Sequence, residues 1–253
     1  MPIGPSGYFI KNAALFDGST GYFSLAAAAD DQDMWVVSMW HKRVDHSVQH
    51  QHLWSAGPTP TSSEDFIWFH KTTGQLYVRI NGTTRLQSTQ VFRDTAAYGH
   101  FMVSYDAANA TNALKLRVWY NGVEITTWTV DSRSAISTGE AQTGTAVNHQ
   151  IGNSVTTAGA SGELNGYLSE FNLAFAGTAP TDATGYGEFN DDGFWVPKKY
   201  TGSYGTEGAH LDFADGAALG NDVSGNNNDF TKNGTVTSVS DTPSDKSANG
   251  TYN

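Results

Sequence analysis

The chain has 253 residues, of which 14 are Lys or Arg and 25 are Asp or Glu, so its formal net charge is −11. Such an acidic chain repels phosphate backbones and anionic headgroups, which disfavours nucleic acids and membrane surfaces as partners. Its 27 glycines and 12% aromatic residues are typical neither of a helical protein nor of a disordered one. The sequence has no cysteine, which excludes disulfides and cysteine-based metal sites or nucleophiles.

The sequence also lacks the usual signals for membrane insertion and secretion. No apolar run approaches the roughly 18 residues that a membrane span needs. The first five residues, Met-Pro-Ile-Gly-Pro, have neither the basic start nor the apolar run of a secretory signal. We therefore expect a protein that is made in a cytoplasm and not inserted into a membrane.

Short strands are predicted along most of the chain, because β-branched and aromatic residues recur in short runs between Gly, Asn, Asp and Thr. Only residues 26–32 favour a helix, and a brief one. In chain order, the predicted strands are 14–16, 22–25, 34–42, 52–55, 66–70, 75–80, 83–86, 99–105, 114–120, 123–130, 149–152, 166–174 and 210–213.

Two Asn-Gly pairs predict tight hairpins. Asn81-Gly82 separates the strands at 75–80 and 83–86, and Asn121-Gly122 separates those at 114–120 and 123–130. Asn and Gly tolerate the positive φ angles of a type I′ turn, whose twist matches that of paired strands. Many short strands with such turns predict an all-β sandwich or jelly roll.

The composition changes near Thr178 and defines the expected domain organisation. Residues 1–13 read as an N-terminal arm and 14–180 as the strand-dense domain. Residues 181–235 form an extension that carries two aromatic clusters. Residues 236–253 are rich in Ser, Thr, Asp and Asn, and we expect a flexible C-terminal arm because they offer little surface to bury.

The order of the strands resembles that of the laminin-G-like, concanavalin A-like jelly rolls. Residues 14–25 resemble their opening strand pair, 35–43 their next strand with its bracketing Trp35 and Trp40, and 116–123 their Asn-Gly hairpin. Residues 151–153 and 164–171 resemble the last core strands. The resemblance implies a two-sheet antiparallel sandwich of jelly-roll type, with the C-terminal extension packed against it.

A second, narrower resemblance is to tailed-phage structural proteins that carry this jelly roll. It is carried by residues 187–189, 193–205, 211–215 and 222–230. It implies a non-enzymatic virion protein made in the host cytoplasm and displayed on the virion surface, as a capsid decoration protein or a short spike or fibre. Its partners would be other capsid or tail proteins and further copies of itself. The alternative is a glycan-binding adhesin that recognises the host surface.

A glycoside hydrolase is the third interpretation, because concanavalin A-like folds include such enzymes. They need two carboxylates about 5–10 Å apart across a cleft. No Glu-x-Asp-x-x-Glu type of strand motif is present. Glu64-Asp65 precedes a strand, and Glu188 lies with Asp191 and Asp192 in a Gly-rich segment. We therefore predict no enzymatic activity and no catalytic residues.

Three aromatic residues are candidates for stacking on sugars. Trp54 and Trp68 lie near loops, and Tyr77 lies across the hairpin region from them. The chain has seven tryptophans, and most of these large apolar side chains are expected to be buried in the core. Trp35 and Trp119, which lie within predicted strands, are examples.

One segment of the extension has oxygen ligands at every second residue, a spacing that suits calcium. These residues are Asp222, Ser224, Asn226 and Asn228. An Asn-rich turn closed by local side-chain hydrogen bonds is the alternative. We expect no other cofactor, since the histidines at 41, 46, 50 and 52 fit no standard metal motif.

The apolar residues of the extension predict that residues 186–234 are ordered, because exposing them together would leave a large apolar patch. These residues are Trp195, Tyr200, Tyr204, Leu211, Phe213 and Phe230.

Overall fold

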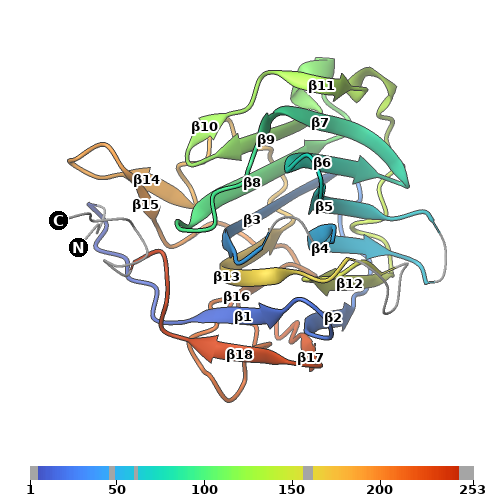
Figure 1. Cartoon of the computed structure of the whole chain (residues 1–253). Helices are drawn as coiled ribbons and strands as arrows, with labels where there is room; N and C mark the ends of the chain where they lie inside the picture. Colours follow the sequence, from blue (N-terminus) through green and yellow to red (C-terminus); the bar gives the residue numbers. More distant parts are fainter. Residues whose placement is uncertain (1–4, 46–48, 60–61, 156–161, 245–253) are drawn as a thin grey trace.

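The computed structural model describes residues 5–45, 49–59, 62–155 and 162–244, and within them it is an all-β sandwich (Figure 1). Two antiparallel sheets of eight strands each enclose one core, and a two-stranded hairpin stands apart from them. This confirms the predicted jelly-roll sandwich.

Sheet A has the order β10-β9-β8-β3-β13-β1-β18, with β16 also paired to β13. Its strands are β1 (Ala13–Asp17), β3 (Met34–Arg43), β8 (Gly99–Asp106), β9 (Leu116–Tyr120), β10 (Val123–Glu124), β13 (Asn165–Ala174), β16 (Ala209–Leu211) and β18 (Val236–Val239).

Sheet B has the order β11-β7-β6-β5-β4-β12-β2-β17. Its strands are β2 (Tyr22–Ala26), β4 (Gln51–Gly57), β5 (Asp65–Phe69), β6 (Gln75–Ile80), β7 (Thr83–Val91), β11 (Trp128–Asp131), β12 (Asn148–Ile151) and β17 (Thr231–Asn233). The separate hairpin is β14 (Gly187–Phe189) with β15 (Trp195–Pro197), and two short 3₁₀ helices span Asn112–Leu114 and Arg133–Ala135.

Both Asn-Gly turns adopt the predicted geometry. The φ angles are 48° and 73° at Asn81 and Gly82, and 48° and 79° at Asn121 and Gly122. Positive φ at both central residues is the signature of a type I′ turn. Gly122 is also required by packing, because a Cβ there would lie 2.4 Å from the Trp195 ring.

Two sequence predictions of secondary structure are wrong. The predicted strand 123–130 is two strands, since β10 pairs with β9 in sheet A and β11 pairs with β7 in sheet B. Residues 26–32 form no helix. Asp30 accepts hydrogen bonds from Thr206 and Glu207, and Asp31 accepts them from Asp33 and Met34, so these side chains compete with helical hydrogen bonds.

The extension supplies strands and core residues rather than a separate layer. Leu211, Phe213 and Phe230 are buried in the main core, as the sequence predicts. The strand β16 pairs with the second half of β13, while β1 pairs with its first half. The strands β17 and β18 complete one edge of each sheet.

The expected C-terminal arm is wrong for its first nine residues. Residues 236–239 form β18, which pairs with β1, and Val236 is only 3% exposed. Ser244 and Thr242 hydrogen-bond to the backbone of Ile10, which is itself buried. The arms at both ends of the chain therefore pair with each other at the sheet edge. Residues 245–253 lie outside the described part.

The hairpin β14–β15 projects from the sandwich in Figure 1. It is attached through Trp195, whose ring lies 5.9 Å from the His100 ring and against Trp119. Its remaining aromatic residues, Phe189 and Phe194, are exposed.

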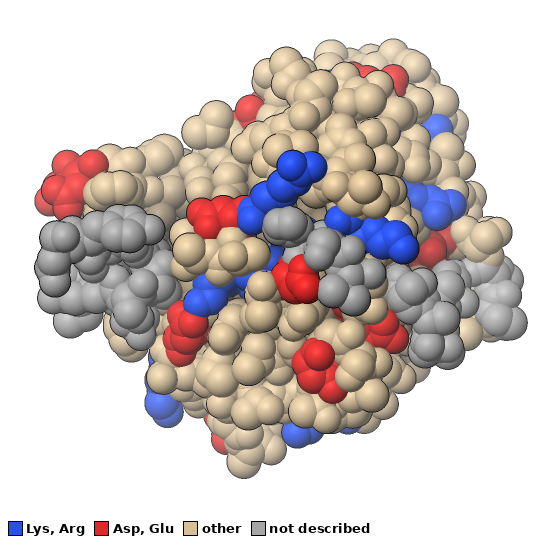
Figure 2. Space-filling view, viewed as in Figure 1, with Lys and Arg blue, Asp and Glu red and all other residues tan. Residues whose placement is uncertain are grey.

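Charges are sparse on the face drawn in Figure 2, where basic and acidic side chains are scattered over a mainly uncharged surface. This agrees with the low charged fraction of 15%.

Candidate functional site: an aromatic and histidine face of sheet B

Alternation along β5 and β6 divides their side chains between the core and the outer surface. Ile67, Phe69, Leu76 and Val78 belong to the core. The residues between them point outward, where pairing places Trp68 opposite Tyr77 and Phe66 opposite Arg79. The neighbouring strand β4 adds His52 opposite Trp68. We call the outward set His50, His52, Phe66, Trp68, His70 and Tyr77 the aromatic face.

Trp68 is the centre of this face. Its ring centroid lies 4.2 Å from that of His50, 5.0 Å from Tyr77 and 5.5 Å from His52, which is stacked on it at an interplanar angle of 13°. His70 completes the row, with its ring 4.7 Å from His50 and 5.7 Å from Tyr77. Trp68, His50, His70 and Tyr77 are half-buried, so parts of their rings contact solvent.

Backbone hydrogen bonds fix the tautomers of the histidines. The Nδ1 of His50 accepts the N–H of Lys71 at 3.3 Å, and the Nδ1 of His70 accepts the N–H of Thr72 at 3.2 Å. In the neutral ring, an acceptor at Nδ1 leaves the proton on Nε2. The Nδ1 of His52 faces the carbonyl of Gly162 at 3.1 Å, so that nitrogen is the donor. The face therefore presents imidazole Nε2–H donors at His50 and His70 beside the indole.

Burial keeps His50 and His52 uncharged at neutral pH. It lowers the pKa of His50 to about 4, helped by the nearby His70 and Lys71, and it lowers the pKa of His52 to about 4. Burial also raises the pKa of the Tyr77 hydroxyl. At neutral pH, His50, His52 and Tyr77 are therefore neutral hydrogen-bonding groups set among aromatic rings. Such a surface suits an uncharged, polyhydroxylated ligand, whose C–H faces pack on rings while its hydroxyls pair with polar tips.

The structure brings together two of the three sugar-stacking candidates and removes the third. Trp68 and Tyr77 are neighbours on the aromatic face. Trp54 is 0% exposed and packs against Trp35 in the core, with 5.5 Å between ring centroids, so its assignment as a surface residue is wrong. The cause is a register shift in β4 between His52 and Trp54, which turns Trp54 inward.

Sequence reasoning missed the histidines of this face. Their signal was present, since His50 and His52 are two residues apart and alternate residues of a strand share one side. His41 does not belong with them, because it is buried against Phe69 and Phe101 in the core. His46 lies outside the described residues.

The segment predicted to bind calcium is a closed turn. The Asp222 carboxylate accepts backbone N–H groups of His210, Ser224 and Asn228 at 2.8–2.9 Å and the Ser224 hydroxyl at 2.8 Å. The amide nitrogens of Asn226 and Asn228 both donate to the carbonyl of Gly208. These local hydrogen bonds are those of the alternative, the Asn-rich turn. Calcium binding by this segment stays a prediction.

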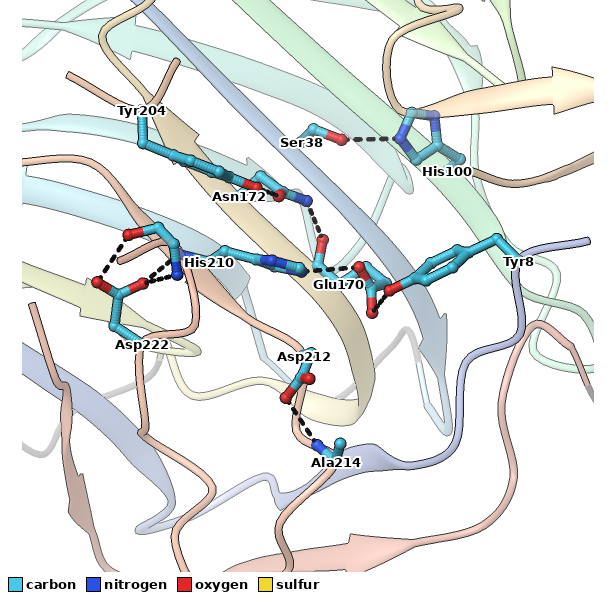
Figure 3. Close-up of polar contacts among 11 residues, drawn as sticks. Tyr8, Ser38, His100, Glu170, Asn172, Tyr204, His210, Asp212, Ala214 and Asp222 are labelled. Carbon is cyan, nitrogen blue, oxygen red and sulfur yellow. Dashed lines mark hydrogen bonds and ion pairs between the residues drawn. The ribbon is translucent and has the colours of Figure 1, made fainter. Parts of the chain in front are cut away.

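A buried polar cluster beside this turn holds the extension to β13 (Figure 3). Glu170 accepts hydrogen bonds from the Tyr8 hydroxyl and from His210 Nε2, both at 2.8 Å. The Tyr204 hydroxyl donates to Asn172 at 2.7 Å. Glu170 has a φ of 51° at the irregularity in β13, and the carboxylate that this bulge presents ties the N-terminal segment to β16. Each of these groups has a partner within the chain, so the cluster is structural.

The described residues contain no group of three or more His, Cys, Asp or Glu side chains that could hold a metal ion. Within them, no helix is long and apolar enough to cross a membrane. The acidic candidates for catalysis do not share a strand, since Glu188 lies in β14 and Glu64 precedes β5, where it accepts a hydrogen bond from Ser154.

No protein-family model matches this sequence, and no curated protein matches it. Among solved structures, a putative carbohydrate-binding protein from Bacteroides ovatus superposes with a TM-score of 0.59 at 14% identity. The superposition covers 92% of this chain and 60% of that protein, so this chain spans about three fifths of its length. This likeness shows a shared fold.

Two further structures are similar at lower scores. A native heptameric SAP-like pentraxin from Limulus polyphemus has a TM-score of 0.45 at 12% identity, covering 66% of this chain and 77% of that one. Domains LG4-5 of the mouse laminin α1 chain also have a TM-score of 0.45 at 12% identity, covering 66% of this chain and 42% of that one.

Proposed function

We propose that this protein binds glycans through the aromatic face of sheet B. The observation that carries the proposal is the half-buried Trp68, which is flanked by Tyr77 and by the imidazoles of His50 and His70. Both imidazoles accept a backbone N–H at Nδ1, so each carries its proton on Nε2 as a hydrogen-bond donor. The protein of similar fold from Bacteroides ovatus is described as a putative carbohydrate-binding protein, which agrees with this use of the surface.

The face suits a sugar for three physical reasons. Trp68 and Tyr77 offer ring surface for the apolar C–H side of a pyranose or furanose ring. His50 and His70 offer donors at the edge of that surface, as orienting groups do in binding sites. All four side chains project from paired strands or their ends, where stacking holds them in place before a ligand arrives.

Binding to an oligosaccharide microarray, followed by calorimetry with the strongest-bound oligosaccharide, tests the proposal. We expect Trp68→Ala and Tyr77→Ala each to weaken binding at least tenfold, which corresponds to about 1.4 kcal/mol. The matched control is Phe194→Ala, since Phe194 is 65% exposed but lies on the hairpin. Equal affinity of the Trp68→Ala and Phe194→Ala variants would contradict the proposal.

The virion role remains a prediction from sequence resemblance. Attachment to a capsid or tail, self-association and location on a virion rest on the resemblance of residues 187–189, 193–205, 211–215 and 222–230 alone. Binding of a host glycan is compatible with such a role, because an adhesin on a virion must both attach to the particle and bind a glycan of the host surface. Absence of turnover likewise stays a prediction.

A further inference from the structure

A small pocket opens at the end of the sandwich where β3 ends and β8 begins. It has a volume of about 100 Å³, and its charged and polar side chains are those of His41, Arg43, Gln90, Arg93, Asp94 and Tyr120. Two arginines and one aspartate give it a positive balance, since burial lowers the pKa of His41 to about 3 and keeps that ring neutral. This is a local exception in a chain of net charge −11.

Arg43 is the unusual member of this lining. Its side chain is only 2% exposed, and its guanidinium lies over the Phe69 ring at 4.4 Å. Within the described residues, the buried Nη2 has no hydrogen-bond partner, and none of the ion pairs includes Arg43. The Asp45 carboxylate acts on the guanidinium only at the level of charge, since no hydrogen bond or ion pair between the two is found among the described residues. A buried cationic nitrogen without a hydrogen-bond acceptor is unfavourable, and an anion bound at Nη2 would supply one.

The guanidinium stays charged at neutral pH. Burial lowers the pKa of Arg43 to about 10, and the neighbouring Arg93 acts in the same direction, while Asp45 and Tyr120 oppose them. Because about three pH units separate this value from neutrality, deprotonation does not relieve the burial. A bound anion would.

Arg93 lines the same pocket and supplies a second, anchored guanidinium. Its Nη2 donates to the carbonyl of Thr73 at 2.9 Å, and its side chain passes over Gly74, where a Cβ would lie 2.9 Å from Arg93 Cγ. The turn that holds Arg93 also holds the aromatic face, because the N–H groups of Thr72 and Thr73 donate to His70 Nδ1. Pocket and face therefore share one turn.

We infer that this pocket binds the carboxylate of an acidic sugar, with Arg43 and Arg93 as its cationic partners. The pocket has a volume of about 100 Å³, which is room enough for a carboxylate group. The ring of that sugar would continue over the turn toward His70. The assignment of an acidic sugar rests on the proposed glycan binding. The anion site itself rests on the burial of Arg43 and on its Nη2 atom, which lacks a hydrogen bond within the described residues.

Thermal unfolding of the full chain in sodium glucuronate, sodium acetate, glucose and sodium chloride tests the inference, with the salts at equal ionic strength. A ligand that binds only the folded state raises Tm saturably, here by about 5 °C or more at one hundred times its Kd. We expect glucuronate and acetate to raise Tm above the chloride reference, and glucose to leave it unchanged. A rise no larger than that in chloride would overturn the inference.

Substitutions show whether the rise in Tm comes from ligand binding in this pocket. Arg43→Met should abolish the shift and leave Tm in chloride unchanged or higher, because it removes an unpaired buried charge. Arg93→Gln, which alters an exposed side chain, should also abolish most of the shift and serves if Arg43→Met fails to fold. Arg117→Met is the matched control, since Arg117 pairs with Glu124 outside the pocket. A shift that persists in both pocket variants would overturn the anion site.

The two proposals can fail separately. Trp68→Ala should keep the shifts produced by acetate and glucuronate while losing binding of neutral oligosaccharides. If Trp68→Ala binds those oligosaccharides normally but Arg43→Met still abolishes the acetate shift, the aromatic face is wrong and the anion site stands. A shift with acetate and none with glucuronate would overturn the acidic-sugar assignment.

Discussion

Asp65 shows how one buried side chain joins three segments. Its carboxylate accepts the N–H groups of Asn81, Gln142 and Thr143 at 2.7–2.8 Å, and also the Thr143 hydroxyl. Burial raises its pKa to about 6 although these hydrogen bonds act to lower it. The residue connects the β6–β7 turn to the segment before β12, so it is a structural acceptor rather than a catalytic carboxylate.

We predict that Asp65→Ala strongly destabilises the fold. The substitution leaves three backbone donors without an acceptor, and each buried unsatisfied donor costs about 1–3 kcal/mol. A loss of at least about 3 kcal/mol is expected from urea unfolding monitored by tryptophan fluorescence. The control Asp192→Ala, at an exposed site, should stay within about 0.5 kcal/mol of the parent.

Trp54 lies in the core and Trp68 on the outer surface, so their substitutions should affect stability differently. We predict that Trp54→Ala lowers the free energy of unfolding by about 3–5 kcal/mol, because the side chain is fully buried between the sheets. The Trp68→Ala variant should lose less stability, since Trp68 is half-buried on the outer face. Chemical denaturation of both variants measures the difference, and equal losses would refute it.

At the residue scale, the sequence could place Trp68 and Tyr77 at the surface, but it misplaced Trp54. Period-two alternation from His52 places Trp54 on the outer face. The register shift after His52 reverses that direction, and a bulge of this kind leaves no local sequence signal. The surroundings of Arg43 were equally unpredictable, because the Phe69 ring and the charge of Arg93 come near it only through the packing of the two sheets.

At the scale of elements, local turn chemistry was a reliable guide and sheet membership was not. Asn81-Gly82 and Asn121-Gly122 specify their backbone angles with little help from distant contacts. The run after Gly122 alternates like one strand, yet it crosses from sheet A to sheet B between Glu124 and Trp128. Alternation reports which side chains are buried, not the sheet to which the strand belongs.

The strand β18 was missed because its composition is that of a tail. Val236–Val239 has two valines and a threonine, but the Ser, Thr, Asp and Asn residues that follow it dominate the segment. Pairing with β1 satisfies its backbone, and Val236 contributes to the main core. Strand β1, which is distant in the sequence, thus supplies the pairing and the apolar contacts that the segment cannot provide by itself.

We predict that Val236→Ala lowers the free energy of unfolding by about 2 kcal/mol, because two buried methylene equivalents are lost and a small cavity remains. The matched control is Val123→Ala, since Val123 also lies in a short edge strand but is 64% exposed. That control should change stability by less than about 0.5 kcal/mol. Similar effects of the two substitutions would mean that β18 does not hold the sheet edge.

For the whole molecule, the strand order and the resemblance together predicted the jelly roll, but not the place of the surface that we propose for glycan binding. The aromatic face combines residues from β4, β5 and β6 with His50 and His70, and only the paired strands bring them together. The virion prediction concerns partners, and partners leave no trace in the packing of one chain.

Buried neutral histidines are distributed through both sheets and couple folding to pH. Burial lowers the pKa of His41 and His100 to about 3, and that of His52 and His149 to about 4. His50 on the aromatic face behaves similarly. In the unfolded chain these groups bind protons below a pKa of about 6.5. Between about pH 6.5 and 4, the unfolded state therefore binds more protons than the folded state.

The sign of the pH dependence follows. Stability rises with pH wherever the unfolded state binds more protons, so it should fall steadily as the pH is lowered from about 6.5 to 4. Asp65 opposes this trend, because its pKa of about 6 lies above its value in the unfolded chain. Because five histidines act against this one carboxyl group, the histidines determine the direction in which stability changes with pH.

We predict that His149→Gln flattens this pH dependence. Both ring nitrogens of His149 lack partners within the described residues, so the substitution removes a titrating group without breaking a hydrogen bond found there. Each such histidine contributes up to about 1.4 kcal/mol per pH unit to the slope between pH 4 and 6.5. Urea unfolding at several pH values should show the variant losing less stability than the parent as the pH falls. Parallel pH profiles would mean that His149 titrates alike in the folded and unfolded chain.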